Sequence, residues 1–154
     1  MSYLQEEKLQ IMTIFDDIGD AVSSAAKAVS STITSQPTAA PRRIAASLVN
    51  NTQKTLTWVD SGVDHGTRDA HAPDTIGPGD TGKWGLKSDG FQTGCEGWMK
   101  WSIGDNGPIV KLDYNNPYVG ANSYSCSVDS AKYTAEREGG TGDHATVRFI
   151  VSNK

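Results

Sequence analysis

The sequence predicts a mainly β protein: an antiparallel β-sandwich preceded by an N-terminal amphipathic helix. Apolar residues recur at helical spacing up to about residue 33, whereas after Arg42 they alternate as they do in strands. Sixteen glycines and six prolines in 154 residues are typical of a loop-rich β protein. We therefore divide the chain into a helix at 1–34, a linker at 35–43 and a sandwich domain at 44–154.

The helix is predicted from apolar side chains that step by three or four residues and so share one face. The principal members of this stripe are Ile11, Phe15, Ile18, Val22 and Val29. The opposite face is polar and carries Asp16, Asp17 and Asp20. The segment TSQPTAAPRR at 34–43 contains two prolines, which end the helix and begin a linker.

Eight short runs of strand-forming residues follow, divided by Gly, Pro and Asn. They span 44–50, 55–60, 82–87, 94–103, 109–114, 122–128, 131–137 and 144–153. The sequence GDNGP at 104–108 predicts a hairpin between two of these runs. Turns at intervals of roughly ten residues favour a sandwich or a barrel.

The alternation also predicts a core. Its expected members are Trp58, Met99, Trp101, Val110, Leu112, Val147 and Phe149. The segment 61–79 is polar and is expected to be a long connection. Its histidines, His65 and His71, are interpreted as solvated loop residues in preference to metal ligands or catalytic groups.

Several functional classes are disfavoured by composition. A formal charge of −4 argues against a nucleic-acid partner, which requires a basic face. No apolar run approaches the roughly 18 residues of a membrane-spanning helix. The chain lacks GxSxG, HExxH and phosphate-binding glycine motifs, so we expect no enzyme, no cofactor and no metal. Cys95 and Cys126 would allow one disulfide, although two small buried hydrophobic side chains is the favoured interpretation.

Aromatic and small polar residues are interleaved at 113–127, DYNNPYVGANSYSCS. Tyrosine has an apolar ring and a polar tip, which suits a membrane interface or a headgroup pocket. The same composition suits a sugar site equally well. A third interpretation is an ordinary loop whose tyrosines, Tyr114, Tyr118 and Tyr124, cap the core.

The order of several short motifs resembles the actinoporin-like superfamily of membrane-binding β-sandwich proteins. After the predicted helix come RRIA at 42–45, NNT at 50–52 and KTLTW at 54–58, followed by IGPG at 76–79 and GCEG at 94–97. A Pro-Tyr pair at 117–118 and a closing strand from His144 complete the resemblance. The middle of the chain is equally similar to the aegerolysins, which lack the N-terminal helix.

The resemblance implies a site for a lipid headgroup. Carried over residue by residue, the actinoporin pocket falls on Ser61, Asn115, Pro117, Tyr124 and Tyr133, and the aromatic loop adds Tyr118. Asn115 replaces the serine of the family at the start of this loop. The tyrosine-rich helix of the family is reduced here to AKYTAEREGG at 131–140. We therefore assign no headgroup preference.

The resemblance and the helix together imply a pore-forming cytolysin. Its sandwich would bind membrane lipids through aromatic loops, and several detached helices would then enter the bilayer as an oligomer. The alternative is a non-lytic lipid- or carbohydrate-binding module whose helix serves assembly or docking, with a glycan as a further candidate partner. The start MSYLQEEKLQ is polar, so we expect a protein secreted or released without a conventional signal peptide that acts at a target membrane.

Overall fold

The computed structural model describes residues 40–154, which form one compact unit. The predicted helix at 1–34 lies outside the described residues, and so do positions 35–39 of the linker. This includes the five stripe residues Ile11, Phe15, Ile18, Val22 and Val29. Within the described part of the chain, no helix is long and apolar enough to cross a membrane.

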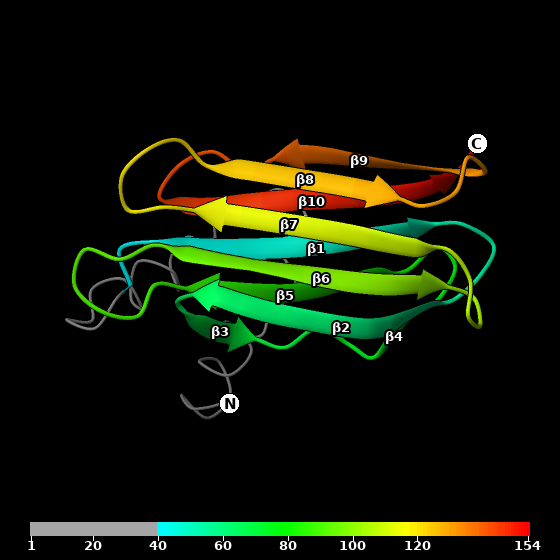
Figure 1. Ribbon diagram of the computed structural model, residues 1–154, viewed down its shortest axis with the longest axis horizontal. Helices are drawn as coiled ribbons and strands as arrows, with labels where there is room; N and C mark the ends of the chain where they lie inside the picture. Colours follow the sequence, from blue (N-terminus) through cyan, green and yellow to red (C-terminus); the bar gives the residue numbers. More distant parts are fainter. Residues whose placement is uncertain (1–39) are drawn as a thin grey trace, which may run out of the picture. The chain divides into compact units, whose positions relative to one another are not determined.

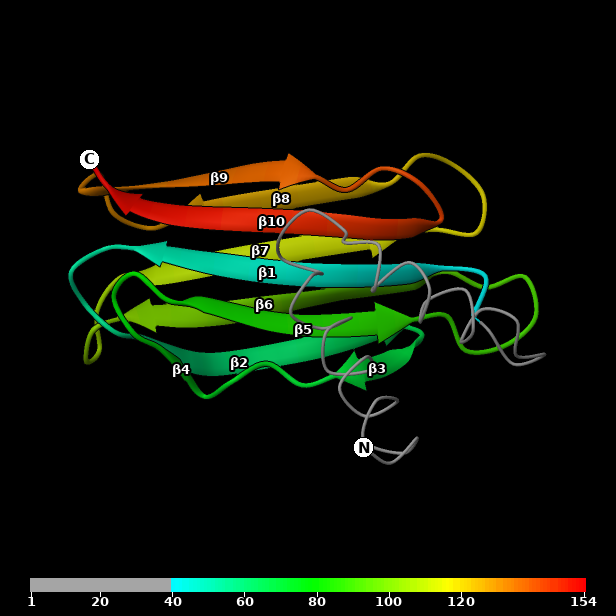
Figure 2. The same ribbon diagram turned by 180° about the vertical axis from the view of Figure 1, so that it is seen from behind.

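The described residues form two five-stranded sheets that face each other (Figures 1 and 2). In the first sheet the order is β3 (Thr67–Ala70), β5 (Thr81–Lys87), β1 (Arg43–Asn51), β10 (His144–Asn153) and β9 (Tyr133–Gly139). In the second sheet the order is β4 (Thr75–Ile76), β2 (Leu56–His65), β6 (Cys95–Ile103), β7 (Ile109–Asn116) and β8 (Ser123–Val128). Strands β1 and β10 pair in parallel, and the other pairs within 40–154 are antiparallel. The expected β-sandwich is confirmed, but its first sheet is mixed, because β1 and β10 pair in parallel where only antiparallel pairing was predicted.

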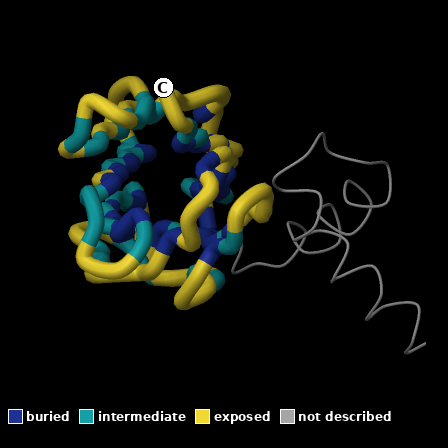
Figure 3. The backbone as a smooth tube through the Cα atoms, turned by 90° about the vertical axis from the view of Figure 1, so that its right-hand side faces the viewer, coloured by how far each residue is buried: buried dark blue, intermediate teal, exposed yellow. Residues whose placement is uncertain are grey.

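Strands β7 and β10 bury alternate residues, because one face of their sheet meets the other sheet, whereas β1 is buried at every position from Ala46 to Asn50. In β10, Val147 and Phe149 are buried while Arg148 between them is exposed. Figure 3 shows buried backbone on the facing sides of the two layers and exposed backbone in the connecting loops. Six of the seven expected core residues are buried: Met99, Trp101, Val110, Leu112, Val147 and Phe149.

The prediction for Trp58 is wrong, because its side chain is 41% exposed. Trp58 lies on β2, which is flanked on one side by β6 and on the other only by the two-residue strand β4. A bulge also follows it, between Trp58 and Asp60. A strand so close to the sheet edge leaves a large side chain partly in solvent.

The prediction of a long connection at 61–79 is also wrong. Strand β2 continues to His65, and β3 and β4 follow within the same segment. The pairing of β2 with β6 persists across two bulges, because the backbone of β6 offers partners along its whole length. Polar side chains do not prevent this pairing, since strands near a sheet edge can turn one face to water.

The hairpin predicted at 104–108 is confirmed, with β6 ending at Ile103 and β7 starting at Ile109. The turn places Asn106 at φ 51°, a left-handed conformation that asparagine tolerates. Ser102 fixes the turn, since its hydroxyl donates to Gly104 O at 2.7 Å and accepts from Gly107 N at 3.1 Å.

Cys95 on β6 and Cys126 on β8 are free thiols.

Candidate functional site

Three loops and the start of β1 gather at one end of the sandwich, on the left of Figure 1. We call this the loop end and define it as residues 40–42, 88–94, 117–122 and 140–143. The turns at 52–55, 104–108 and 129–132 lie at the opposite end. The arrangement follows from strand direction, because β5, β7 and β9 all run toward the loop end.

Arg42 fastens the loops of this end to one another, and its side chain is only 15% exposed. Its Nε donates to Pro117 O at 3.1 Å, and its Nη2 donates to Tyr118 O at 2.7 Å. Its Nη1 lies 3.4 Å from Asp143 Oδ2, and its backbone N–H donates to Ser88 Oγ at 3.1 Å. One residue therefore connects the start of β1 to all three loops.

Two asparagine amides complete the framework of the loop end. Asn116 is buried, and its Nδ2 donates to Arg43 O at 2.9 Å and to Asp143 O at 2.7 Å. The Nδ2 of Asn122 donates to Gly140 O at 2.8 Å. These bonds join the two asparagine side chains to backbone carbonyls of β1 and of the loop at 140–143, so the loops hold a fixed shape.

Gly94 lets two of the loops approach closely. A Cβ at this position would lie 2.6 Å from Asn116 O and 2.7 Å from Pro117 Cα. Both atoms belong to backbone, which a larger residue could not displace without moving the chain. The loop at 88–94 therefore rests directly on the beginning of the loop at 117–122.

The tips of these two adjoining loops carry exposed apolar side chains. Phe91 is 88% exposed and Val119 is 83% exposed, more than the other large hydrophobic residues within 40–154. Tyr118 precedes Val119, and its ring lies under the Arg42 guanidinium, 4.8 Å from centroid to Cζ. Two exposed apolar side chains are thus carried by loops whose base is polar and hydrogen-bonded.

The six residues predicted for a headgroup pocket lie in four places. Pro117 and Tyr118 are at the loop end, whereas Tyr133 starts β9 at the opposite end. Asn115 and Tyr124 line a hollow of about 220 Å³ beside Asp64, Glu96 and Asp113. Ser61 lines a separate pocket between the sheets. The fold therefore brings Asn115 and Tyr124 together in one hollow, but it does not unite all six residues.

Tyr124 makes contacts of a core-capping residue. Its hydroxyl donates to Gly140 O at 2.8 Å, and its ring meets the Phe149 ring edge-on at 6.5 Å between centroids. Arg137 covers the ring at 5.3 Å. Burial raises the pKa of the Tyr124 phenol, so the hydroxyl remains a hydrogen-bond donor at neutral pH.

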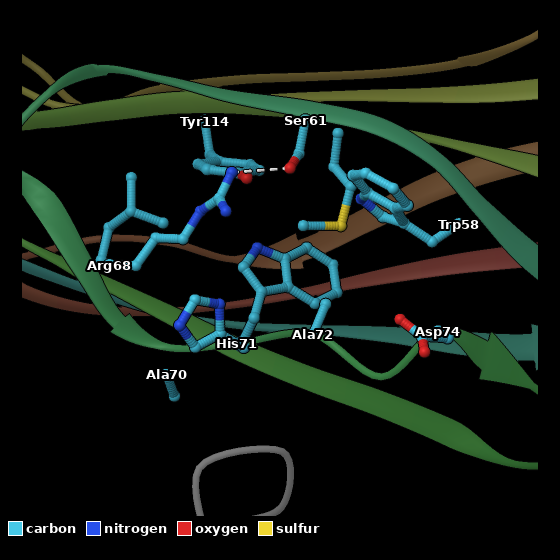
Figure 4. Close-up of a pocket in the computed structure, with 11 residues that line it drawn as sticks. Trp58, Ser61, Arg68, Ala70, His71, Ala72, Asp74 and Tyr114 are labelled. Atoms are coloured by element: carbon cyan, nitrogen blue, oxygen red, sulfur yellow. Dashed lines mark hydrogen bonds between the residues drawn. The ribbon is translucent and has the colours of Figure 1, made fainter.

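A pocket of about 330 Å³ opens between β2 and the segment that contains β3 (Figure 4). Its apolar and aromatic lining consists of Trp58, Ala70, Ala72, Trp84, Leu86, Met99 and Tyr114. Its polar lining consists of Ser61, Arg68, His71 and Asp74. Burial raises the pKa of Tyr114, whose phenol is therefore neutral. We call this the side pocket.

No group of three or more His, Cys, Asp or Glu side chains within 40–154 is placed to hold a metal ion. His65 lies instead in a pair with Glu96, with Nδ1 and Oε2 2.9 Å apart. His144 Nε2 lies 3.2 Å from Ala40 O.

Sequence reasoning missed the residues that shape the two most distinctive surfaces. Arg42 entered only as part of a motif, and Phe91, Val119 and Arg68 were not selected. A signal existed for Phe91, a large apolar residue inside the glycine-bounded loop GFQTG at 90–94. No sequence pattern indicated Arg68, because its pocket forms only where β2 of one sheet and β3 of the other lie opposite each other.

Neither a family model nor a curated protein matches this chain. Two solved structures are similar in fold. The lipid binding protein Nakanori superposes with a TM-score of 0.70 at 14% identity, covering 96% of this chain and 86% of that one. RahU, solved in complex with a TRIS molecule, gives 0.63 at 15% identity, covering 75% and 98%. At such identities the likeness shows the fold, and function has to be argued from the surface.

Proposed function

We propose that the protein binds membrane lipids and docks on the bilayer through the loop end. The observation that carries this proposal is the position of Phe91 and Val119. These two strongly exposed apolar side chains stand on adjoining loops at one end of a rigid sandwich. Exposed apolar groups ringed by polar ones mark sites of interaction with membranes or partners.

The energetics suit reversible docking. Full burial of an apolar side chain of this size contributes roughly 1.5–3 kcal/mol, so two of them contribute a few kcal/mol. Tyr118 adds an amphipathic ring at the depth where lipid headgroups lie. The fixed loop framework around Arg42 lowers the entropic cost, because the base of the loops that carry the apolar tips is already held in place.

Charge at the loop end favours neutral lipid surfaces. The four segments that define it contain two carboxylates, Asp89 and Asp143, and one cation, Arg42. An anionic bilayer attracts basic clusters, and this surface has none. Docking should therefore depend on apolar insertion and respond weakly to salt.

The similarity in fold to a lipid binding protein, Nakanori, supports the same function.

The finer part of the proposal is pore formation by an oligomer, with the helix at 1–34 as the inserting element. About 25 helical residues at roughly 1.5 Å each reach about 37 Å, which exceeds the roughly 30 Å hydrocarbon layer. Clustered helices would direct Asp16, Asp17 and Asp20 into a wet lumen, since charges facing lipid are costly. The alternative is a non-lytic lipid- or carbohydrate-binding module.

Dye release and co-sedimentation with liposomes of varied headgroup and sterol separate these functions. Deleting residues 1–34 should abolish dye release and preserve sedimentation, because the loop end remains. Ile18→Asp in the full chain should act in the same way by placing a charge on the apolar stripe. Ser23→Asp, on the polar face of the same predicted helix, is the matched control and should leave release intact.

Dye release by the truncated protein would show that the pore does not depend on this helix. Sedimentation with no release from any of the liposomes, by the full chain or its variants, would select the binding module. Failure of the full chain to sediment with any of them would contradict lipid binding itself.

A further inference from the structure

We infer that the side pocket is a second binding site, which takes a small organic monocarboxylate with an apolar body. The inference is independent of the proposed membrane function, because the pocket lies between β2 and β3 and shares no residue with the loop end. It rests on a cation, a buried hydrogen-bond donor and apolar walls that meet in one cavity.

The cation is Arg68. Its Nη2 donates to Ser61 Oγ at 2.7 Å, as the dashed line in Figure 4 marks. The five salt bridges found within 40–154 do not include it. A guanidinium carries five N–H donors in a planar fork, and this fork matches the two oxygens of a carboxylate. The arrangement leaves donors of Arg68 available to a ligand in the pocket.

The buried donor is the indole of Trp84, which lines the same cavity. Its Nε1 is buried and makes no well-formed hydrogen bond among the described residues, and the phenol of Tyr114, which also lines the pocket, is its nearby acceptor. Buried N–H groups are normally paired, so an acceptor oxygen of a ligand that reaches this depth would give the indole a well-formed hydrogen bond. Trp101 Nε1 is also buried and unpaired, but it does not line the pocket. The combination of Trp84 with Arg68 therefore distinguishes the site.

The remaining lining limits the rest of the ligand. Leu86 and Met99 present apolar surface, and Trp58 adds an aromatic wall. In Figure 4, Asp74 lies on the side of Trp58, away from Arg68. A second carboxylate on the ligand would meet this negative charge. The volume of about 330 Å³ is at the small end of the range for ligand sites.

The test is isothermal titration calorimetry of the full-length protein with phenylacetate and with its neutral analogue phenylacetamide. We expect phenylacetate to bind and the amide to bind about tenfold or more weakly, as loss of a charge-assisted hydrogen bond implies. Arg68→Gln should weaken phenylacetate binding by a similar factor. Arg148→Gln removes an arginine on β10 that pairs with Glu138 on β9. It is the matched control and should leave binding unchanged.

Trp84→Phe keeps an aromatic ring but removes the pyrrole part of the indole together with its N–H, and it should weaken phenylacetate binding about threefold or more while thermal unfolding checks the fold. Three results would each overturn the inference. They are equal binding of acid and amide, no measurable binding of phenylacetate, and an Arg68→Gln variant that binds phenylacetate as tightly as the native chain does. The comparison of acid with amide uses the native protein, so it tests the inference even if a variant fails to fold. Liposome sedimentation of Arg68→Gln should be unchanged, which separates this site from the loop end.

Discussion

Replacing Phe91 and Val119 together by serine is expected to lower the affinity for neutral liposomes by about tenfold or more. Each substitution removes an apolar side chain that docking would bury, and each is worth roughly 1.5–3 kcal/mol when buried completely. The folded protein should lose little stability, because both side chains are exposed before docking. Co-sedimentation measures the affinity, and thermal unfolding checks the fold.

Val59→Ser is the matched control for this variant. Val59 is 46% exposed, and it lies at the bulge of β2 outside the loop end. Its replacement should leave liposome binding unchanged. A control that loses as much affinity as the loop variant would show that general surface hydrophobicity drives binding. A loop variant that binds like the native chain would exclude docking through Phe91 and Val119.

Phe149→Ala is expected to reduce the free energy of unfolding by about 3–5 kcal/mol, the usual cost of a large aromatic truncation in a core. Phe149 is fully buried on β10, and its ring packs against Tyr114 and Tyr124 at 6.5 Å between centroids. The cavity would open where rings from the two sheets meet. Such a loss is a large share of the roughly 5–15 kcal/mol that stabilises a typical domain.

Urea unfolding of the full-length chain measures this cost. Phe91→Ala is the same chemical change at an exposed position, and it should alter the free energy of unfolding by less than about 0.5 kcal/mol. Equal losses in the two variants would be incompatible with the core described here.

The strands were predictable where one face of a sheet is buried. Alternation at Val147 and Phe149 follows directly from a strand with one side against the other layer. The same rule failed at Trp58, because a position near the sheet edge is decided by the neighbouring strands. It failed again for β3 and β4, because these strands are short and polar and carry no alternation of their own. They form only by pairing with more apolar strands.

The candidate site was less predictable, because its contacts connect residues far apart in sequence. Arg42 meets the carbonyl of Tyr118, 76 positions away, and no local pattern indicates that bond. The aromatic segment at 113–127 includes Tyr118, which the fold places at the loop end. It gave no means of separating Tyr118 from Tyr124, whose ring packs on Phe149.

The direction of docking is tested most directly by a polarity-sensitive fluorophore on single cysteines at the two ends of the sandwich. Val119→Cys labels the loop end, and Asp105→Cys labels the hairpin turn at the opposite end. Both require Cys126→Ser, because Cys126 is half-buried and free. Cys95 can stay, since burial raises the pKa of its thiol to about 12 and so suppresses the reactive thiolate at neutral pH.

Docking through the loop end predicts that neutral liposomes shift the emission of the label at position 119 to the blue and leave the label at position 105 unchanged. A blue shift at position 105 with none at position 119, in protein that sediments with the liposomes, would contradict it.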